Sequence, residues 1–134
     1  MERFILDGTK QYNLLNAIPA KNNRVYAIQL NDGIKENQRF LQHNPNIDLY
    51  KPAFYIGQTS KNREERYDEH KKGIRSNIFA QNYGLEPYEA ADKTYELAEQ
   101  FKVPVDDLRH YQALYYELKL TTLLQENGYG AYSK

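Results

Sequence analysis

The stretch from Ala53 to Ser60 restricts the possible folds more than any other part of the chain. Apolar and aromatic residues run to Ile56, and Gly57 then interrupts them before a series of polar turn formers. A charged segment with helical spacing follows, so the pattern predicts a buried strand that leads through a tight glycine turn into a helix. Arg66 and His70 are four residues apart and would share one face of that helix.

Three side chains of this unit are suited to phosphate chemistry. The phenol of Tyr55 would lie at the end of the strand, facing the space that Arg66 and His70 border. A phenol, a guanidinium and an imidazole that converge in this way form a phosphodiester site.

Each of these residues also has an ordinary alternative. Tyrosine makes up 13 of 134 residues, so a strand tyrosine is often a packing residue. Arg66 lies among other basic residues and could be a surface charge, and His70 could be structural.

The overall composition indicates a single domain. With 134 residues the chain can bury a real hydrophobic core. It contains no cysteine, which excludes disulfides and thiolate metal ligands. It has no apolar run of membrane-spanning length and no signal-peptide pattern at its beginning. We therefore expect a soluble, cytoplasmic protein without a membrane partner.

The charges balance over the whole chain but not along it. Lys and Arg total 18, Asp and Glu total 18, and the formal net charge is zero. This argues against a protein that coats nucleic acid through bulk charge. Residues 61–75 nevertheless carry six basic and four acidic side chains, whereas residues 86–107 carry seven acidic side chains and two lysines. A basic edge of this kind suits a small nucleic-acid footprint, although charged segments are also ordinary solvated helix faces.

The sequence predicts a small α/β (α+β) domain with a short antiparallel sheet flanked by helices. Residues 1–23 are expected as an N-terminal extension that packs on the domain formed by 24–134. Strands are predicted at 25–30 and 53–57, with a weaker third strand at 85–88. Helical patterns are predicted at 34–44, 62–73, 76–83, 88–101 and 105–127, the last with Pro104 at its first turn and Gly128 at its end. The segment 31–52 is a long connection of the kind that often has a functional role.

Two tyrosine-bearing strands, followed by a helix with Arg and His, resemble the GIY-YIG nuclease superfamily. The first motif reads Val25-Tyr26-Ala27 and the second reads Tyr55-Ile56-Gly57. The resemblance covers roughly residues 24–130. It is greatest to small stand-alone bacterial members, which also have a long insert before a Phe-Tyr-(Val/Ile)-Gly-Gln-Thr strand.

The resemblance implies a metal-dependent endonuclease that hydrolyses DNA phosphodiester bonds, with RNA not excluded as a substrate. Tyr26 would act as the general base for the attacking water, helped by a neighbour such as His70. Arg66 would bind a non-bridging phosphate oxygen, and Tyr55 would hydrogen-bond the phosphate or the nucleophile. Glu117 would hold Mg²⁺ or Mn²⁺, because a hard cation can be bound by one carboxylate and several waters.

Other residues are secondary candidates for the same site. Glu126 is a poorer match for the metal-binding carboxylate, Asn127 matches an asparagine of the family, and Lys71 is a further candidate. The chain departs from the family pattern at Arg24, where many members have glycine, and in the length of the segment between the two tyrosines. That insert, residues 31–52, could cover or reshape the substrate cleft.

Two alternatives to a stand-alone nuclease remain open at the level of sequence. The first is a non-catalytic GIY-YIG-fold module that binds nucleic acid or a protein, which the neutral net charge favours. The second is a toxin, restriction or mobile-element subunit whose specificity lies in the insert or in a partner. Whether the chain forms a dimer would help to discriminate, because one site per chain cuts one strand at a time.

Overall fold

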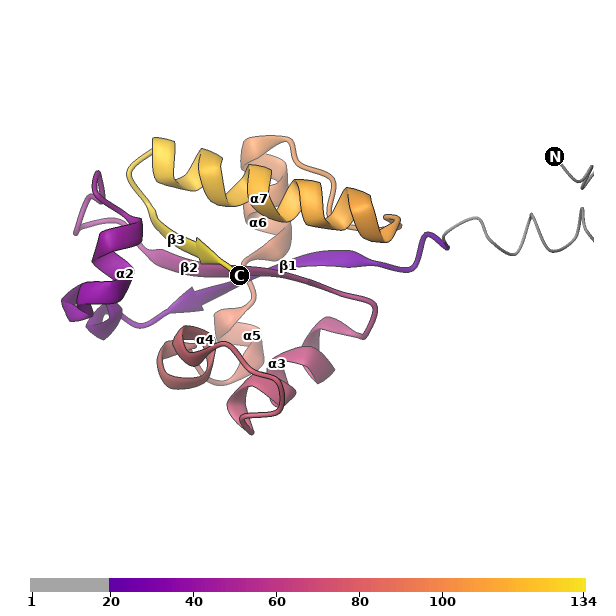
Figure 1. Cartoon of the computed structure of the whole chain (residues 1–134), viewed down its shortest axis with the longest axis horizontal. Coiled ribbons are helices and arrows are strands. Elements are labelled where there is room, and N and C mark those ends of the chain that lie inside the picture. The colour runs from indigo at the N-terminus through magenta and orange to yellow at the C-terminus, as the bar shows by residue number, and fades with distance from the viewer. Residues whose placement is uncertain (1–19) are drawn as a thin grey trace, which may run out of the picture.

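A computed structural model of the chain describes residues 20–134. The predicted packing of residues 1–23 on the domain therefore lies outside the described residues, except for 20–23. The described part has a mixed α/β (α+β) fold in which helices cover both faces of a three-stranded sheet (Figure 1), and this confirms the predicted fold class. The elements in chain order are β1 (Arg24–Leu30), η2 (Asp32–Glu36), α2 (Gln38–His43), β2 (Ala53–Thr59), α3 (Arg63–Lys71), α4 (Ile78–Tyr83), α5 (Tyr88–Ala91), α6 (Thr94–Phe101), α7 (His110–Glu126) and β3 (Gly130–Ser133).

The central strand of the sheet is β2. It pairs with β1 in antiparallel fashion over its whole length, from Ala53 to Thr59. On its other side β3 pairs in parallel, and only as far as Ile56. The predicted antiparallel arrangement is therefore right for β1 and β2, whereas the sheet as a whole is mixed because α7 carries the chain back across it before β3 begins. Beyond Ile56, residues 57–59 of β2 have no strand on that side among the described residues.

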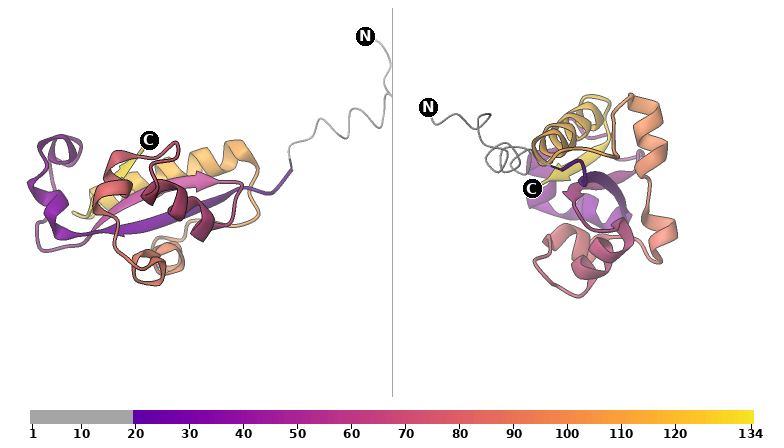
Figure 2. Two further views of the ribbon diagram at one scale, coloured as in Figure 1. Left: turned by 90° about the horizontal axis from the view of Figure 1, so that it is seen from below. Right: turned by 90° about the vertical axis from the view of Figure 1, so that its right-hand side faces the viewer.

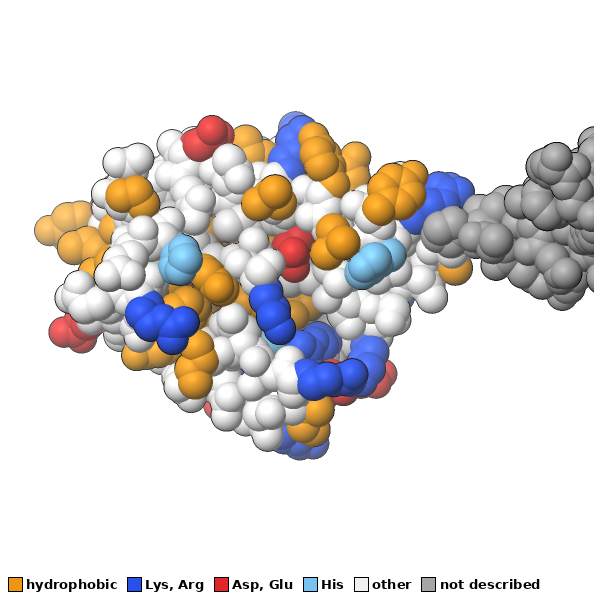
Figure 3. Space-filling view, viewed as in Figure 1, with side chains coloured by type: hydrophobic (Ala, Val, Ile, Leu, Met, Phe, Trp, Pro, Cys, Tyr) orange, Lys and Arg blue, Asp and Glu red, His pale blue; other side chains and the backbone are white. Residues whose placement is uncertain are grey.

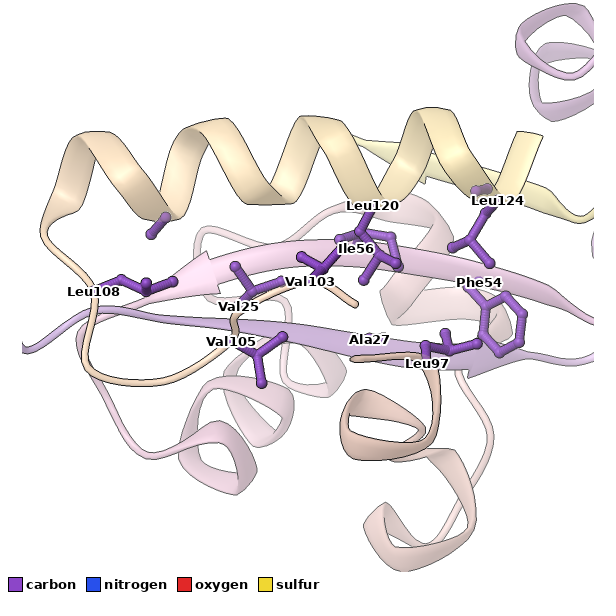
Figure 4. Packing of buried hydrophobic residues seen from close by; sticks show 12 residues of the cluster. Val25, Ala27, Phe54, Ile56, Leu97, Val103, Val105, Leu108, Leu120 and Leu124 are labelled. Carbon is purple, nitrogen blue, oxygen red and sulfur yellow. The ribbon is translucent and has the colours of Figure 1, made fainter. Parts of the chain in front are cut away.

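Both faces of the sheet are buried, which explains why β1 and β2 read as nearly continuous apolar runs. One face carries Val25, Ala27, Phe54 and Ile56, and it packs against α6 and α7 through residues such as Leu120 (Figure 4). The opposite face carries the two motif tyrosines and packs against η2, α2, α3, α4 and α5. The end-on view in Figure 2 shows α7 on one side of the sheet and α3 and α4 on the other.

The predicted third strand at 85–88 is wrong. This segment meets the outer edge of β1 through isolated hydrogen bonds and does not form a strand ladder. The Leu85 N–H donates to the Gln29 carbonyl (3.0 Å), next to an isolated bridge between Leu30 and Gly84. The third strand is β3 instead, at the end of the described chain. Its four residues are a glycine, two other small residues and a tyrosine, and so short a segment has no alternating apolar pattern that would mark it as a strand.

The helical predictions after residue 84 are correct in type but wrong in extent. The pattern at 88–101 is divided into α5 and α6 because the Lys93 N–H donates to Ala27 of β1 (2.9 Å). The pattern at 105–127 becomes helical only at His110, and Pro104 lies outside its first turn. The preceding segment is held by β1 instead, since the Val25 N–H donates to the Val105 carbonyl (2.9 Å).

The earlier helices agree more closely with the predictions. Helices α3 and α4 begin after Asn62 and Asn77, whose side chains accept hydrogen bonds from the first-turn N–H groups. The patchy pattern at 34–44 corresponds to η2 and α2. Within the described residues, none of the helices has the length and apolar character needed to cross a membrane.

Candidate active site

The five residues that the resemblance names come from four elements. Tyr26 lies on β1, Tyr55 on β2, Arg66 and His70 on α3, and Glu117 on α7. In the register of the sheet, Tyr26 is opposite Gly57 and Tyr55 is opposite Ile28, so the two tyrosines are diagonal neighbours on one face. Their ring centroids are 6.1 Å apart.

Gly57 is required by the position of the Tyr26 ring. A Cβ atom built on Gly57 would lie 2.3 Å from both Cζ and Oη of Tyr26, far inside van der Waals contact. The glycine of the second motif therefore provides the space in which the tyrosine of the first motif lies. This cross-strand dependence gives the two motifs a physical connection that neither shows in the sequence alone.

His70 is fully buried beneath the two tyrosines, with its two ring nitrogens in different roles. Nε2 lies 2.8 Å from Oη of Tyr26, and Nδ1 accepts a hydrogen bond from the backbone N–H of Asn77 (3.0 Å). A backbone N–H can only donate, so Nδ1 carries no hydrogen. Burial, together with the positive charge of Arg66, lowers the pKa of His70 from 6.5 to about 4. The ring is therefore neutral near pH 7, its hydrogen is on Nε2, and His70 donates to the oxygen of Tyr26.

This direction of donation fixes what His70 can do for Tyr26. As a donor it stabilises a tyrosinate, but it does not remove the phenolic hydrogen. That hydrogen points away from the imidazole. Burial raises the pKa of Tyr26 to about 12, while the positive charge of Arg66 opposes the increase and the negative charge of Glu117 adds to it. Burial also raises the pKa of Tyr55, with further contributions from Tyr26 and Glu117.

Arg66 is held in place by the segment that follows α3. Its Nη1 donates to the Ile74 carbonyl (3.2 Å) and pairs with Oε1 of Glu69 (3.1 Å), and its Nη2 donates to the Arg75 carbonyl (2.8 Å). Arg75 has a backbone φ of 44°, in the left-handed region that is unusual for a residue with a side chain. The guanidinium is thus anchored by two carbonyls and a carboxylate, and its charge acts on both Tyr26 and His70.

Glu117 approaches the phenols from the other side of the sheet. It is mostly buried on α7, and burial raises the pKa of its carboxyl from 4.5 to about 7. Within residues 20–134 its carboxylate makes no hydrogen bond or ion pair. No buried side-chain oxygen or nitrogen of that part lacks a partner, so the carboxylate oxygens reach the surface. A lone carboxylate without a compensating cation suits a metal ion that keeps most of its ligands as water. The described residues contain no group of three or more His, Cys, Asp or Glu side chains that could hold a metal ion.

An open polar cleft extends from Arg66 past the end of β3. Its basic side chains belong to Lys61, Arg66, Arg75, His110 and Lys134, and Glu69 is its acidic residue. The remaining lining residues are uncharged: Asn23, Gln58, Thr59 and Ser60. On the face shown in Figure 3, several Lys and Arg side chains lie close to an acidic side chain near the centre. The basic edge predicted for 61–75 therefore contributes Lys61, Arg66 and Arg75 to a cleft whose charged side chains are mainly basic.

Two cleft residues were not found from the sequence. His110 and Lys134 reach the cleft from the start of α7 and from the end of the described chain. Lys134 is close enough for its charge to lower the pKa of His70. Neither residue belongs to a motif, and only the folded topology brings them beside α3, so no sequence signal marked them.

The secondary candidates lie in other networks. Lys71 Nζ donates to the carbonyls of Gln81 (3.1 Å) and Gly84 (2.9 Å). The Asn127 side chain donates back to Leu123 (2.8 Å) at the end of α7, next to the exposed Glu126.

The two departures from the family pattern also lie outside the tyrosine group. Arg24 donates to the Lys61 carbonyl after β2. None of the residues that line the cleft comes from 31–52. The insert, which could cover or reshape a substrate cleft, therefore forms no part of the wall of this cleft.

Comparison of the chain with models of protein families, with curated proteins and with solved structures finds no match.

Proposed function

We propose that the protein is a metal-dependent endonuclease that hydrolyses DNA phosphodiester bonds. The proposal is supported chiefly by one observation. Five residues that the GIY-YIG resemblance names separately, from four elements, form a single group around the Tyr26 oxygen. Tyr26 is hydrogen-bonded to His70, and the charges of Arg66 and Glu117 both act on its phenol.

Arg66 and the cleft around it would bind the phosphodiester. The guanidinium is held in place before any substrate arrives, so little side-chain entropy is lost when it contacts a phosphate oxygen. Lys61, Arg75 and Lys134 line the same cleft and provide further positive charge for the flanking phosphates. Such a site binds a short length of nucleic acid and does not require a positive net charge on the whole chain.

Tyr26 would accept the proton of the attacking water. Its pKa of about 12 leaves little tyrosinate in the free protein, so the phenol needs support from its neighbours. His70 supplies a hydrogen bond that favours the ionised oxygen, and Arg66 supplies a positive charge beside it. Tyr55, whose raised pKa keeps its hydrogen in place, would donate to the phosphate.

Glu117 would hold Mg²⁺ or Mn²⁺, which when bound supplies charge neutralisation for the phosphoryl and leaving 3′ oxygens. The negative charge of Glu117 is one of the influences that raise the pKa of Tyr26. Compensating that charge would favour tyrosinate. A cation bound at Glu117 on α7 would therefore lower the pKa of the proposed base, Tyr26 on β1.

The test is cleavage of supercoiled plasmid, branched DNA and single-stranded DNA, each with Mg²⁺, with Mn²⁺ and with EDTA. The wild-type chain is compared with Glu117→Gln, and a thermal melt of both separates loss of the site from unfolding. We expect metal-dependent nicking that the variant lacks. Cleavage by a folded variant at the wild-type rate would contradict the role of Glu117.

A non-catalytic module that binds nucleic acid or a protein is the second candidate. The formal net charge of zero and the raised pKa values of both tyrosines favour it. The same experiment discriminates between the two candidates. Retarded migration of DNA without cleavage in any metal would select the binding module.

A further inference from the structure

Helix α7 has a second apolar face, opposite the one that packs on the sheet. Its core-facing side carries Ala113, Leu120 and Leu124. The outer side carries Tyr115 and Leu118, which are 58% and 62% exposed. Hydrophobic side chains gather over α7 on the face shown in Figure 3. A helix that is apolar on both sides is typical of a helix covered on both sides.

The outer face is shaped as a groove with two charges along it. Its lining residues are Tyr115, Leu118, Lys119, Thr122, Leu123 and Glu126. Lys119 and Glu126 are seven residues apart and share one side of the helix. Neither forms an ion pair with another of the described residues, and the Lys119 ammonium lies 5.9 Å from the ring centroid of Tyr115 on its own helix.

We propose that this face binds a second copy of the chain, with the two α7 helices antiparallel around a two-fold axis between Thr122 and Leu123. In that arrangement each Lys119 meets the partner's Glu126, because both are equally far from the axis. Thr122 and Leu123 meet at the centre, and Leu118 packs beside them. The groove is thus complementary to itself in charge and in apolar surface, as a two-fold interface requires.

The pairing leaves the candidate active site accessible. Glu117 lies on the side of α7 that faces the sheet, and it is buried there. Tyr111 and Leu114 stay outside the pairing, near the beginning of α7. The dimer would therefore carry two open clefts, one in each subunit. The inference does not depend on the proposed function, since it rests only on the outer face of α7.

Charge reversal tests the pairing directly, with the molar mass of the full chain measured by sedimentation over a range of concentrations. Wild type should form a dimer. Lys119→Glu and Glu126→Lys should each weaken it by about tenfold or more, because each change creates two like-charge contacts. The double variant carrying both changes should recover the wild-type dissociation constant. Lys93→Glu, a charge reversal at the residue before α6, is the matched control and should have no effect.

A cysteine cross-link gives an independent readout, because the chain has no cysteine of its own. Thr122→Cys should form a disulfide-linked dimer on mild oxidation, whereas Tyr95→Cys, on exposed surface of α6, should not. A monomer at every concentration would overturn the proposal, whatever else covers the groove. So would a dimer that is unaffected by Leu118→Glu, or a double charge reversal that fails to restore association.

Discussion

His70 and Glu117 are two buried titratable groups whose pKa values are displaced in opposite directions. The pKa of His70 falls to about 4 and that of Glu117 rises to about 7, in both cases mainly through burial. Both displacements favour the uncharged form near the middle of the pH range. The group around Tyr26 is therefore assembled from neutral side chains beside one anchored guanidinium, that of Arg66.

These displacements make opposite contributions to the pH dependence of stability. The lowered pKa of His70 stabilises the fold above pH 6.5, and this contribution is lost as the pH falls to about 4. The raised pKa of Glu117 stabilises the fold below pH 4.5, and this contribution is lost as the pH rises to about 7. Between pH 4.5 and 6.5 the increase in stability from His70 and the decrease from Glu117 nearly cancel, so these two groups leave the stability of the wild-type chain almost independent of pH there.

Glu117→Gln removes one of these opposing contributions. Its free energy of unfolding should rise by about 2 to 3 kcal/mol between pH 4.5 and 6.5, because only the His70 contribution remains. Urea unfolding at several pH values measures this. Glu99→Gln, at an exposed position on α6, should keep the wild-type profile. A flat profile in folded Glu117→Gln would contradict the assignment of these two groups.

Metal binding at Glu117 should also depend on pH. The carboxyl must lose its proton to hold a cation, and its pKa is about 7. Mg²⁺ should therefore raise the melting temperature of the wild-type chain more at pH 8 than at pH 6, and it should not raise that of Glu117→Gln. An equal shift in both proteins would place the binding of Mg²⁺ elsewhere.

Among the secondary-structure elements, β2 is the one on which the site depends most. It pairs with β1 through its full length, but its pairing with β3 ends at Ile56, so the last residues of β2 form an open edge on that side. The cleft lies there, lined by Gln58, Thr59 and Ser60. A longer β3 would fill this edge and close the space in front of Arg66.

Gly57→Ala tests the dependence of the site on this strand. The added methyl would overlap the Tyr26 ring, so the ring or the strand must move. We expect the free energy of unfolding to fall by about 1 to 3 kcal/mol. Nuclease activity should fall by a larger fraction than the amount of folded protein does. Gln29→Ala, at a half-buried position of β1 that does not line the cleft, is the control. Wild-type activity in Gly57→Ala would contradict the importance of the position of Tyr26.

The sequence predicted those elements whose signals are local. The runs of β1 and β2 and the asparagine-capped helices depend on residues that are close in the chain. The tight turn predicted at Gly57 is wrong, because β2 continues through Gly57 to Thr59 and Gly57 pairs with Tyr26 of β1. Residues 105–109 have a helical pattern, but Val105 accepts a hydrogen bond from Val25 of β1, and β3 is too short to stand out. The candidate site residues were named because the resemblance joined separate motifs, and their roles stay predictions. The place of Lys134 in the cleft and its effect on the pKa of His70 could not be predicted, because both depend on residues that are far apart in the sequence.

At the scale of the whole molecule, zero net charge coexists with a cleft whose charged side chains are mainly basic. Lys61 and Arg66 pair with Glu69 there, whereas Arg75 and Lys134 have no ion pair with another of the described residues. DNA binding should therefore be weak and should involve few phosphates. The acidic side chains elsewhere on the surface would limit contact with DNA to the region of the cleft.

The salt dependence of DNA binding measures how many phosphates the cleft contacts. Arg75→Gln should reduce the slope of log K against log salt concentration by about 1, because one phosphate contact is lost. Lys93→Gln, which removes a charge just before α6 that pairs with Glu96, should leave the slope unchanged. Equal changes in both variants would show that the protein binds DNA through its general surface charge.

The most direct test of the central claim is the rate at which Tyr26→Phe nicks supercoiled plasmid in Mg²⁺. The change removes one buried oxygen, together with its hydrogen bond to His70, and leaves the ring in place. Tyr50→Phe, at a fully exposed tyrosine, is the matched control. We predict that folded Tyr26→Phe loses about 100-fold or more of the wild-type rate while Tyr50→Phe keeps it. A folded Tyr26→Phe that nicks at the wild-type rate would contradict a hydrolytic site built around this phenol.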